Sequence, residues 1–220
     1  MYSAAIFDMD GLLIDSERVI LRAWVEAARG IGREVDEADY AAVVGRTEAE
    51  SVPILEALLG GAANLRRVHE TAQQLLNAEG RPAFPLKSGA QALLQVLRSR
   101  GVPCAVASST AVHEVRRRLD AVGVLEHFAT IVGGNEVPRG KPDPAIYALA
   151  AARLGVETHT CLAFEDSENG ARSVLAAGMA LVVVPDLRAP PPEVLHRAAA
   201  VLGELGHALE RVPGWFAQPS

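Results

Sequence analysis

Two carboxylates lie two residues apart near the start of the chain, in the segment Asp8-Met9-Asp10-Gly11. They directly follow a short apolar run, residues 4–7, that is typical of a buried parallel strand. Ligands of open α/β sheets bind at the carboxyl ends of strands, so these acids would stand where chemistry is done. Two carboxylates in such a place repel each other unless a cation or a proton lies between them. The alternative is an ordinary surface turn, in which Asp and Gly serve the backbone geometry.

Two serines and a lysine lie in two other segments that could contribute to a site. Ser108 and Ser109 come after the apolar run 102–107, where they could bind an anion at a helix start or simply cap that helix. Lys141 is one of two lysines in the chain, and a glycine and a proline on either side of it restrict its backbone. A lysine at the site would neutralise a carboxylate and a phosphate together, whereas a solvated loop lysine would have no such role.

Glu165 and Asp166 end the apolar run 160–164 and precede a predicted helix. They could complement the dipole of that helix, and they could also bind a metal ion. Magnesium prefers oxygen ligands and retains water, so Asp8, Asp166 and water molecules would suit it. The sequence therefore predicts an Mg²⁺ site.

The segments that must position these residues alternate between strand and helix patterns after residue 85. This alternation predicts an α/β fold, with a Rossmann-like three-layer core around a parallel sheet. The predicted strands are residues 4–7, 102–107, 128–132, 160–164, 180–184 and 198–202, and the predicted core helices are residues 89–100, 111–121, 142–154, 167–177 and 204–211.

Only helical patterns appear between the first strand and the rest of the predicted sheet. We therefore expect a core domain of residues 1–14 and 85–220 and an inserted helical cap domain of residues 15–84. A cap in this place can close over the acids and exclude water. Its predicted helices are residues 17–29, 36–44, 48–59 and 62–79.

Composition argues against several classes of protein. The net charge of −6 disfavours a general electrostatic contact with nucleic acid or an anionic membrane. No apolar run approaches the ~20 residues of a membrane span, and the first strand leaves no room for a signal peptide. We expect a cytoplasmic monomer with Cys104 and Cys161 as buried free thiols. Arg116, Arg117 and Arg118 are expected on a solvated helix face.

The order and spacing of these motifs resemble the haloacid dehalogenase superfamily. Within it, the chain is similar to the phosphatases and β-phosphoglucomutases that have a small helical cap after the first motif. The matching segments are residues 8–17, residues 107–110, residues 140–144, and residues 164–167 with Gly170, and together they span most of the chain.

The resemblance implies a role for each matching residue. Asp8 would attack phosphorus and form an aspartyl-phosphate. Asp10 would protonate the leaving oxygen and then activate the water that releases phosphate. Ser108 would hold phosphate oxygens, and Lys141 would steady Asp8 and the transferring group. The implied metal ligands are Asp8, Asp10 through its backbone carbonyl, Glu165 and Asp166, and the predicted substrate-binding residues are Met9, Gly11, Glu17, Arg46, Thr47 and Ser109.

These residues favour a magnesium-dependent phosphatase that acts on a small phosphorylated metabolite. An acid at Asp10 argues against a dehalogenase, and the lack of any lysine in the predicted cap argues against a phosphonatase. Phosphoryl transfer of the β-phosphoglucomutase type is an alternative, although Ile20 and Glu48 stand where the resemblance implies a histidine and a basic residue in sugar-phosphate mutases. Arg46 could grip an anion or pair with a surface glutamate. A non-catalytic module that binds a phosphate ligand is the alternative from another class.

Overall fold

The computed structural model describes residues 1–36, 38–39, 43, 48–77 and 84–217. The chain divides into two compact units, one formed by Met1–Asp15 with Ala83–Ser220 and the other by Ser16–Pro82. We call them the core unit and the helical unit. That the helical unit serves as a cap domain stays a prediction.

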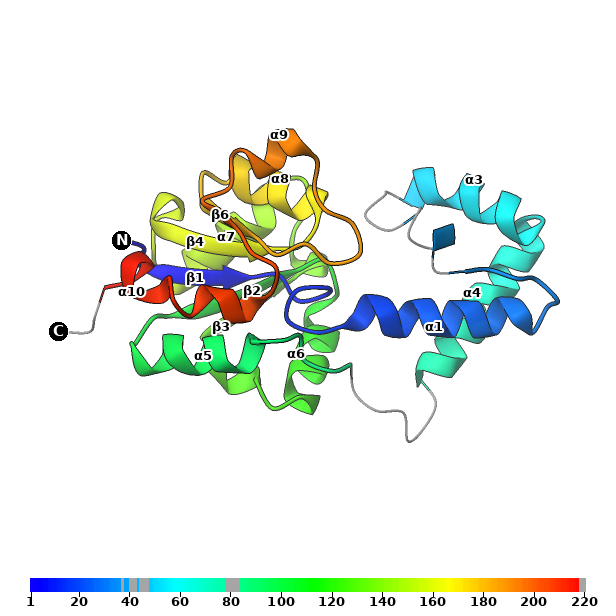
Figure 1. Cartoon of the computed structure of the whole chain (residues 1–220), viewed down its shortest axis with the longest axis horizontal. Coiled ribbons are helices and arrows are strands. Elements are labelled where there is room, and N and C mark those ends of the chain that lie inside the picture. The colour runs from blue at the N-terminus through cyan, green and yellow to red at the C-terminus, as the bar shows by residue number, and fades with distance from the viewer. Residues whose placement is uncertain (37, 40–42, 44–47, 78–83, 218–220) are drawn as a thin grey trace. The chain divides into compact units, whose positions relative to one another are not determined.

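The core unit is built on a six-stranded parallel sheet, with the strand order β3-β2-β1-β4-β5-β6 (Figure 1). The predicted α/β fold is confirmed, because β1 to β5 arise from short apolar runs that the sheet largely buries. In the centre, Phe7 of β1 pairs with Val106 of β2 and with Phe164 of β4. The strands are β1 (Ala4–Phe7), β2 (Cys104–Ser108), β3 (Thr130–Gly133), β4 (Cys161–Glu165), β5 (Ala180–Val183) and β6 (Ala200–Val201).

Helices cover both faces of this sheet, as the predicted three-layer architecture requires. Successive strand residues point to opposite faces. Ala5 and Phe7 therefore join one hydrophobic cluster, which includes residues of α5, α6 and α10. Ala4 and Ile6 join a second cluster on the other face, with residues of α7, α8 and α9. These helices are α5 (Ala90–Ser99), α6 (Val112–Ala121), α7 (Ala145–Leu154), α8 (Glu168–Ala176), α9 (Pro192–Leu195) and α10 (Val212–Trp215).

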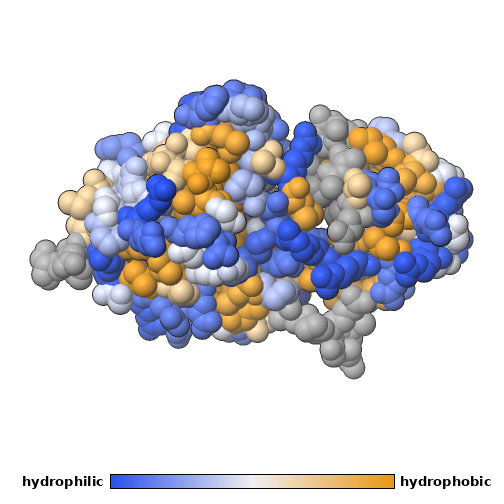
Figure 2. Space-filling model, viewed as in Figure 1, coloured by the Kyte–Doolittle hydropathy of each residue, from blue (hydrophilic) through white to orange (hydrophobic). Residues whose placement is uncertain are grey.

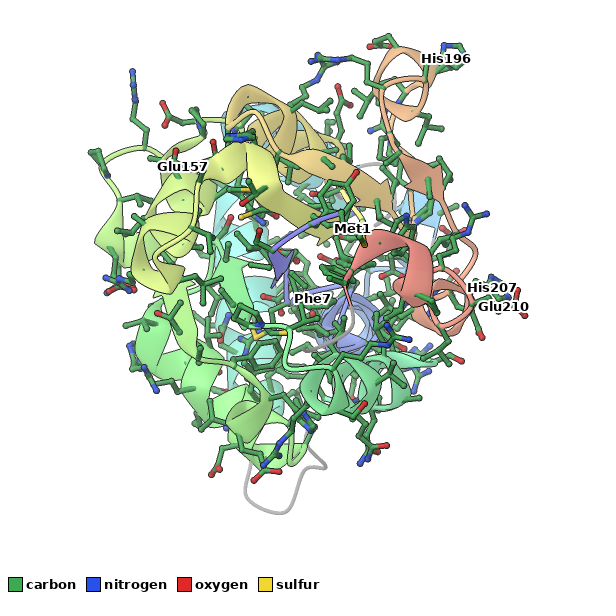
Figure 3. All side chains as sticks on the ribbon, turned by 90° about the vertical axis from the view of Figure 1, so that its left-hand side faces the viewer. Met1, Phe7, Glu157, His196, His207 and Glu210 are labelled. Carbon is green, nitrogen blue, oxygen red and sulfur yellow. The ribbon has the colours of Figure 1, made fainter. Side chains whose placement is uncertain are left out.

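Aromatic stacking joins the two central strands inside the core unit. The rings of Phe7 and Phe164 are stacked with centroids 4.7 Å apart. In Figure 3 Phe7 lies in the interior, whereas Glu157 and His207 project at the periphery. Figure 2 shows apolar residues interspersed with hydrophilic ones on the visible face, and the large hydrophobic side chains that the described residues leave exposed are those of Met1 and Val201.

The helical unit has a small hydrophobic core of its own. It contains α1 (Ser16–Arg29), α3 (Glu48–Leu59) and α4 (Ala62–Asn77). Within the unit, the ring of Trp24 meets that of His69 edge to face, at 6.1 Å. Most of the helix predicted for residues 36–44 lies outside the described residues. The buried residues of this core are Ala23, Ala27, Ala28, Leu59, Val68 and Ala72.

The structure also tests the predictions about the two cysteines and about membrane-spanning segments. Cys104 and Cys161 are buried free thiols, as predicted. Among the described residues, no helix combines the length and the apolar composition needed to cross a bilayer.

Two predicted helices differ from the structure, and each contains a residue that disfavours the helix, Gly206 in one and Pro144 in the other. The single helix predicted for residues 204–211 is wrong, since the chain instead forms a 3₁₀ turn at Leu205–Ala208 and then α10. The helix predicted from residue 142 begins at Ala145, because the ring of Pro144 disfavours the helical conformation at the preceding Asp143. The Ala145 amide instead donates to Asp143 Oδ1 at 3.0 Å.

Gly89 should be intolerant of substitution. Its φ is +77°, and a Cβ built there would lie 2.0 Å from the backbone nitrogen of Gly206. We expect Gly89→Ala to lower the free energy of unfolding by about 2 kcal/mol or more, because backbone must move in addition to the left-handed strain. Urea denaturation measures this loss. Gly101→Ala is the control, since Gly101 has φ +66° and open space around the added methyl group; equal losses for the two variants would contradict the prediction.

Candidate active site

The ends of the three central strands converge at one edge of the sheet. From β1 the chain continues to β2 and β3 on one side of this strand, and it then crosses to β4 on the other side. The carboxyl end of β1 is therefore a topological switch point, where open α/β sheets bind ligands. Asp8 follows β1 directly, Ser108 is the last residue of β2, and Glu165 is the last residue of β4. The loop before α7 adds Lys141. Four segments that are far apart in the sequence therefore meet at this edge.

Lys141 binds two of the carboxylates that the strands deliver. Its Nζ lies 2.5 Å from Asp8 Oδ1 and 2.6 Å from Glu165 Oε1. The Nζ also lies 3.2 Å from the Tyr147 hydroxyl, which donates to the same Glu165 oxygen at 2.8 Å. The lysine is buried, so these charge-assisted hydrogen bonds replace its hydration. The alternative of a solvated loop lysine is excluded by this geometry.

Glu165 has both carboxylate oxygens occupied by protein donors. Oε1 accepts from Lys141 and Tyr147, and Oε2 accepts from the backbone nitrogens of Asp166 and Ser167 and from the Ser167 hydroxyl. Gly170 makes room for this group, because a Cβ there would lie within 3 Å of three Glu165 side-chain atoms. The geometry thus favours Glu165 as the anchor of Lys141.

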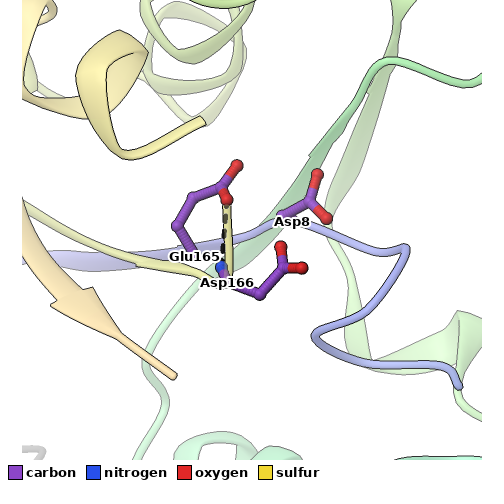
Figure 4. A group of neighbouring side chains, drawn as sticks. All are labelled: Asp8, Glu165 and Asp166. Atoms are coloured by element: carbon purple, nitrogen blue, oxygen red, sulfur yellow. Dashed lines mark hydrogen bonds between the residues drawn. The ribbon is translucent and has the colours of Figure 1, made fainter. Parts of the chain in front are cut away.

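Asp8, Glu165 and Asp166 bring carboxylate oxygens within 4.8 Å of one another. In Figure 4, the carboxylates of Asp8 and Asp166 face a shared space, while the Glu165 side chain turns back toward the Asp166 backbone nitrogen. Three carboxylates against one lysine leave an excess of negative charge in a buried place. A hard divalent cation such as Mg²⁺ prefers oxygen donors of this kind, so the residues present fit that ion.

The pKa values of the cluster report the same imbalance of charge. Burial raises the pKa of Asp8 to about 8, and the charges of Glu165 and Asp10 add to this against the opposing effect of Lys141. The pKa of Asp166 lies well above its usual range, because of burial and then of the negative Glu165 and Asp8. Burial also acts to raise the pKa of Glu165, but contact with Lys141 outweighs it and the pKa is lowered. A cation beside Asp8 and Asp166 would relieve this cost.

Asp10 lies apart from the lysine and has different partners. Its Oδ2 accepts from Thr110 Oγ1 at 2.9 Å, and its Oδ1 accepts from Arg118 NH1 at 2.8 Å. About a quarter of the side chain is exposed, at 25%. Ser108 Oγ accepts from the Thr110 backbone nitrogen at 3.1 Å, which leaves the Ser108 hydroxyl proton for another acceptor. The two acids of the first motif therefore have separate environments.

The other predicted binding residues have mixed outcomes. The Met9 side chain is fully buried in the core, so only its backbone is available to a ligand. Gly11 has φ +82°, and a Cβ there would lie 2.3 Å from Asp166 Oδ2, so glycine is needed for this close approach. Ser109 is exposed near the β2 end. Glu17 lies on α1 in the helical unit, and the predicted Arg46 and Thr47 lie outside the described residues.

Sequence reasoning gave no site role to Arg118, Tyr147 or Thr110, which contact the acids. Arg118 was expected on a solvated face, and this is wrong, because it pairs with Asp10. A signal existed: Arg118 lies three residues after the buried Val115 and four after Glu114, next to the apolar stripe of its helix. Tyr147 lies on the buried stripe of α7, where nothing in its spacing distinguishes a hydrogen-bonding tyrosine from a core aromatic residue.

Known proteins resemble this chain over most of its length. The family model of the haloacid dehalogenase-like hydrolases matches residues 2–178. A phosphorylated carbohydrates phosphatase of Thermotoga maritima is 32% identical, over 80% of this chain and 82% of that protein. Hexitol phosphatase B of Escherichia coli K12 is 30% identical, over 83% of each. The crystal structure of a mutant of CbbY from Rhodobacter sphaeroides, in complex with xylulose-1,5-bisphosphate, has a TM-score of 0.72 at 26% identity and covers 95% of this chain and 97% of that one.

Asp166→Asn should stabilise the protein when divalent cations are removed with EDTA. The substitution removes one negative charge from a buried cluster that repels it, so we expect the free energy of unfolding at pH 8 to rise by about 1 kcal/mol or more. The pKa of Asp166 is higher in the folded state than in the unfolded state. Wild type therefore loses stability relative to the variant as the pH rises above about 4, where unfolded aspartate ionises.

Chemical denaturation of both proteins at pH 4 and pH 8 measures this difference. Asp120→Asn on the exposed side of α6 is the control, because it removes a carboxylate that lies outside the cluster. A destabilised Asp166→Asn protein in EDTA at pH 8, with unchanged Asp120→Asn, would contradict the account of the cluster.

Proposed function

Because this chain belongs to the haloacid dehalogenase-like hydrolase family, we propose that it is a phosphatase that releases inorganic phosphate from a phosphorylated sugar or sugar alcohol. The observation that carries the proposal is the buried contact of Lys141 with Asp8, beside Asp166. It gives one carboxylate a fixed orientation and a neighbouring positive charge, in a place where parallel sheets bind ligands.

Asp8 is the proposed nucleophile. One of its carboxylate oxygens would attack phosphorus, the bond from phosphorus to the leaving oxygen would break, and an aspartyl-phosphate would form. Lys141 is suited to offset the charge of Asp8 and of the incoming phosphoryl group together. Glu165 and Tyr147 would act by holding Lys141 in place. The Ser108 hydroxyl would donate a hydrogen bond to a phosphate oxygen.

Asp10 is the proposed acid and base. It would give a proton to the leaving oxygen as the first bond breaks, and would then take a proton from the water that attacks the aspartyl-phosphate. The second step returns Asp8 as a carboxylate and releases phosphate. The separate surroundings of the two acids support this division, because Asp8 is buried against Lys141 whereas Asp10 is partly exposed.

Mg²⁺ is the proposed cofactor, with Asp8, Asp166 and the backbone carbonyl of Asp10 as its protein ligands. When bound, it would supply positive charge that balances the carboxylates against a phosphate dianion. Glu165 was included among the implied ligands, but its saturated hydrogen bonding supports a part in positioning Lys141 instead.

The substrate class rests on the related proteins. Their names specify phosphorylated carbohydrates and hexitols, and one related structure holds a sugar bisphosphate. A compact polyol phosphate fits these three names. A cytoplasmic location, a monomeric state and the absence of a nucleic-acid partner stay predictions from the sequence. The alternative is a mutase that moves phosphate between positions of one sugar. The products distinguish the two, because a phosphatase releases inorganic phosphate and a mutase forms an isomeric sugar phosphate.

Asp8→Asn should abolish phosphate release, because the amide is no nucleophile. We expect a loss on the order of 10³-fold or more in kcat for hexitol and hexose phosphates, as for other nucleophile replacements. Release of inorganic phosphate from such a panel is the measurement, with Asp120→Asn as the control that keeps wild-type rates. Interconversion of hexose phosphates by wild type, with negligible phosphate release, would favour the mutase instead.

Mg²⁺ should stabilise the wild-type protein as well as activate it. Removal of Mg²⁺ with EDTA is expected to stop turnover, and its return to restore both activity and a higher melting temperature, because the ion binds the folded state. Asp166→Asn should show little or no Mg²⁺-induced rise in melting temperature, whereas Asp120→Asn should show the full rise. An equal rise in all three proteins would count against Asp166 as a ligand.

A further inference from the structure

Arg118 differs from the two arginines that precede it on α6. Arg116 and Arg117 are exposed, with 64% of the Arg117 side-chain surface accessible, whereas only 17% of the Arg118 side chain is accessible. Arginine is rarely buried unless it is paired. The partner of Arg118 is Asp10, whose Oδ1 accepts from NH1 at 2.8 Å.

Two neighbours fix the guanidinium in place. Nε donates to Glu114 Oε1 at 2.8 Å, one helical turn earlier, and Cζ lies over the Phe84 ring at 4.7 Å from its centroid. Hydrogen bonds from Arg117 and Arg118 outweigh burial and lower the pKa of Glu114 to about 2, so this counter-charge persists at any physiological pH. An ion pair at i,i+4 and a stacked ring restrict a side chain that otherwise has many rotamers.

The contacts to Asp10 orient its carboxylate and leave part of its hydrogen-bonding capacity unused. Arg118 reaches Oδ1, and Thr110 Oγ1 reaches Oδ2. Each carboxylate oxygen has two lone pairs, so each retains the capacity to accept one more proton or hydrogen bond. Two donors on two different oxygens fix both the position and the plane of the group.

We propose that Arg118 is a positioning residue for phosphoryl transfer, and that with Thr110 it holds the Asp10 carboxyl where its proton can reach the leaving oxygen. This inference rests on the proposed function, because it gives Arg118 a part in that reaction. In the step concerned, the bond from Asp8 to phosphorus forms, the bond to the leaving oxygen breaks, and the proton passes from Asp10 to that oxygen. A general acid acts only within hydrogen-bond reach of its target, so a carboxyl free to rotate transfers its proton less often.

The dependence of the rate on the leaving group tests this role directly. We would measure kcat/KM, which reports the first phosphoryl transfer, for the full chain with Mg²⁺ and a series of aryl phosphates from p-nitrophenyl phosphate to phenyl phosphate. Nitrophenolate departs without a proton, whereas the more basic phenolate needs one. The variants are Arg118→Ala, Arg118→Lys and the matched control Arg116→Ala, which removes an exposed arginine from the same helix.

Arg118→Ala is expected to lose about 10-fold or more in kcat/KM on phenyl phosphate but less than about 3-fold on p-nitrophenyl phosphate, which is a steeper dependence on leaving-group basicity. Arg118→Lys should recover part of the loss, and Arg116→Ala should follow wild type. A uniform loss across the series, a loss in KM alone or an unchanged slope would overturn the proposal, since a substrate contact or a purely structural role gives those results.

A second variant keeps the test decisive if Arg118→Ala does not fold, as judged by circular dichroism. Thr110→Val removes the other hydrogen bond to Asp10, so a steeper slope supports the proposal and an unchanged slope overturns it. Failure of the proposed function looks different: wild type itself would then hydrolyse none of the aryl phosphates in the presence of Mg²⁺, and the role of Arg118 would fall with it.

Discussion

The buried Lys141 pairs with the carboxylates of Asp8 and Glu165, and Asp166 adds a third carboxylate beside them. The rest of the site depends on this imbalance of charge. Burying a charge without a partner costs several kcal/mol, so each carboxylate needs compensation. Asp8 and Glu165 obtain it from the lysine, and Glu165 adds backbone, serine and tyrosine donors. Asp166 receives the least, and burial together with the negative charges of Glu165 and Asp8 raises its pKa well above the ordinary range. This negative charge is costly to bury, and either a proton or a bound cation would offset it. Stability and function are therefore opposed at this site.

The parallel sheet explains how such a cluster can be assembled at all. Parallel strands end at the same edge, so side chains that follow β1, β2 and β4 become neighbours although some 150 residues separate the first from the last. Stacking of Phe7 on Phe164 fixes the two central strands from one face. Close packing of the acids also requires glycine at two positions, since a Cβ on Gly11 or Gly170 would occupy the space of an acidic side chain. The hydrophobic layers supply the rigidity that the repelling charges lack.

Asp8 and Asp10 show how surroundings can separate two identical side chains. Both follow β1, yet one is buried against Lys141 and the other is partly exposed between Thr110 and Arg118. Enzymes that need a nucleophile and a proton donor use such differences to divide the work between two carboxyl groups. The arginine that grips Asp10 is more than a hundred residues away along the chain, and its partner is set by how α6 packs on the sheet.

The sequence by itself determined the α/β class, the alternation of strands and helices, and the acids that follow the strands, and it singled out Lys141 in a loop. These follow from local signals: apolar runs predict buried strands, and the polar residues directly after them must meet at one edge. Only the tertiary structure decided that Glu165 is saturated by Lys141, Tyr147 and backbone amides, and that Arg118 turns inward to Asp10. Those outcomes depend on strand register, helix rotation and side-chain rotamers, which arise from contacts between distant segments. A pattern along one segment carries no information about which distant partner its side chains will meet.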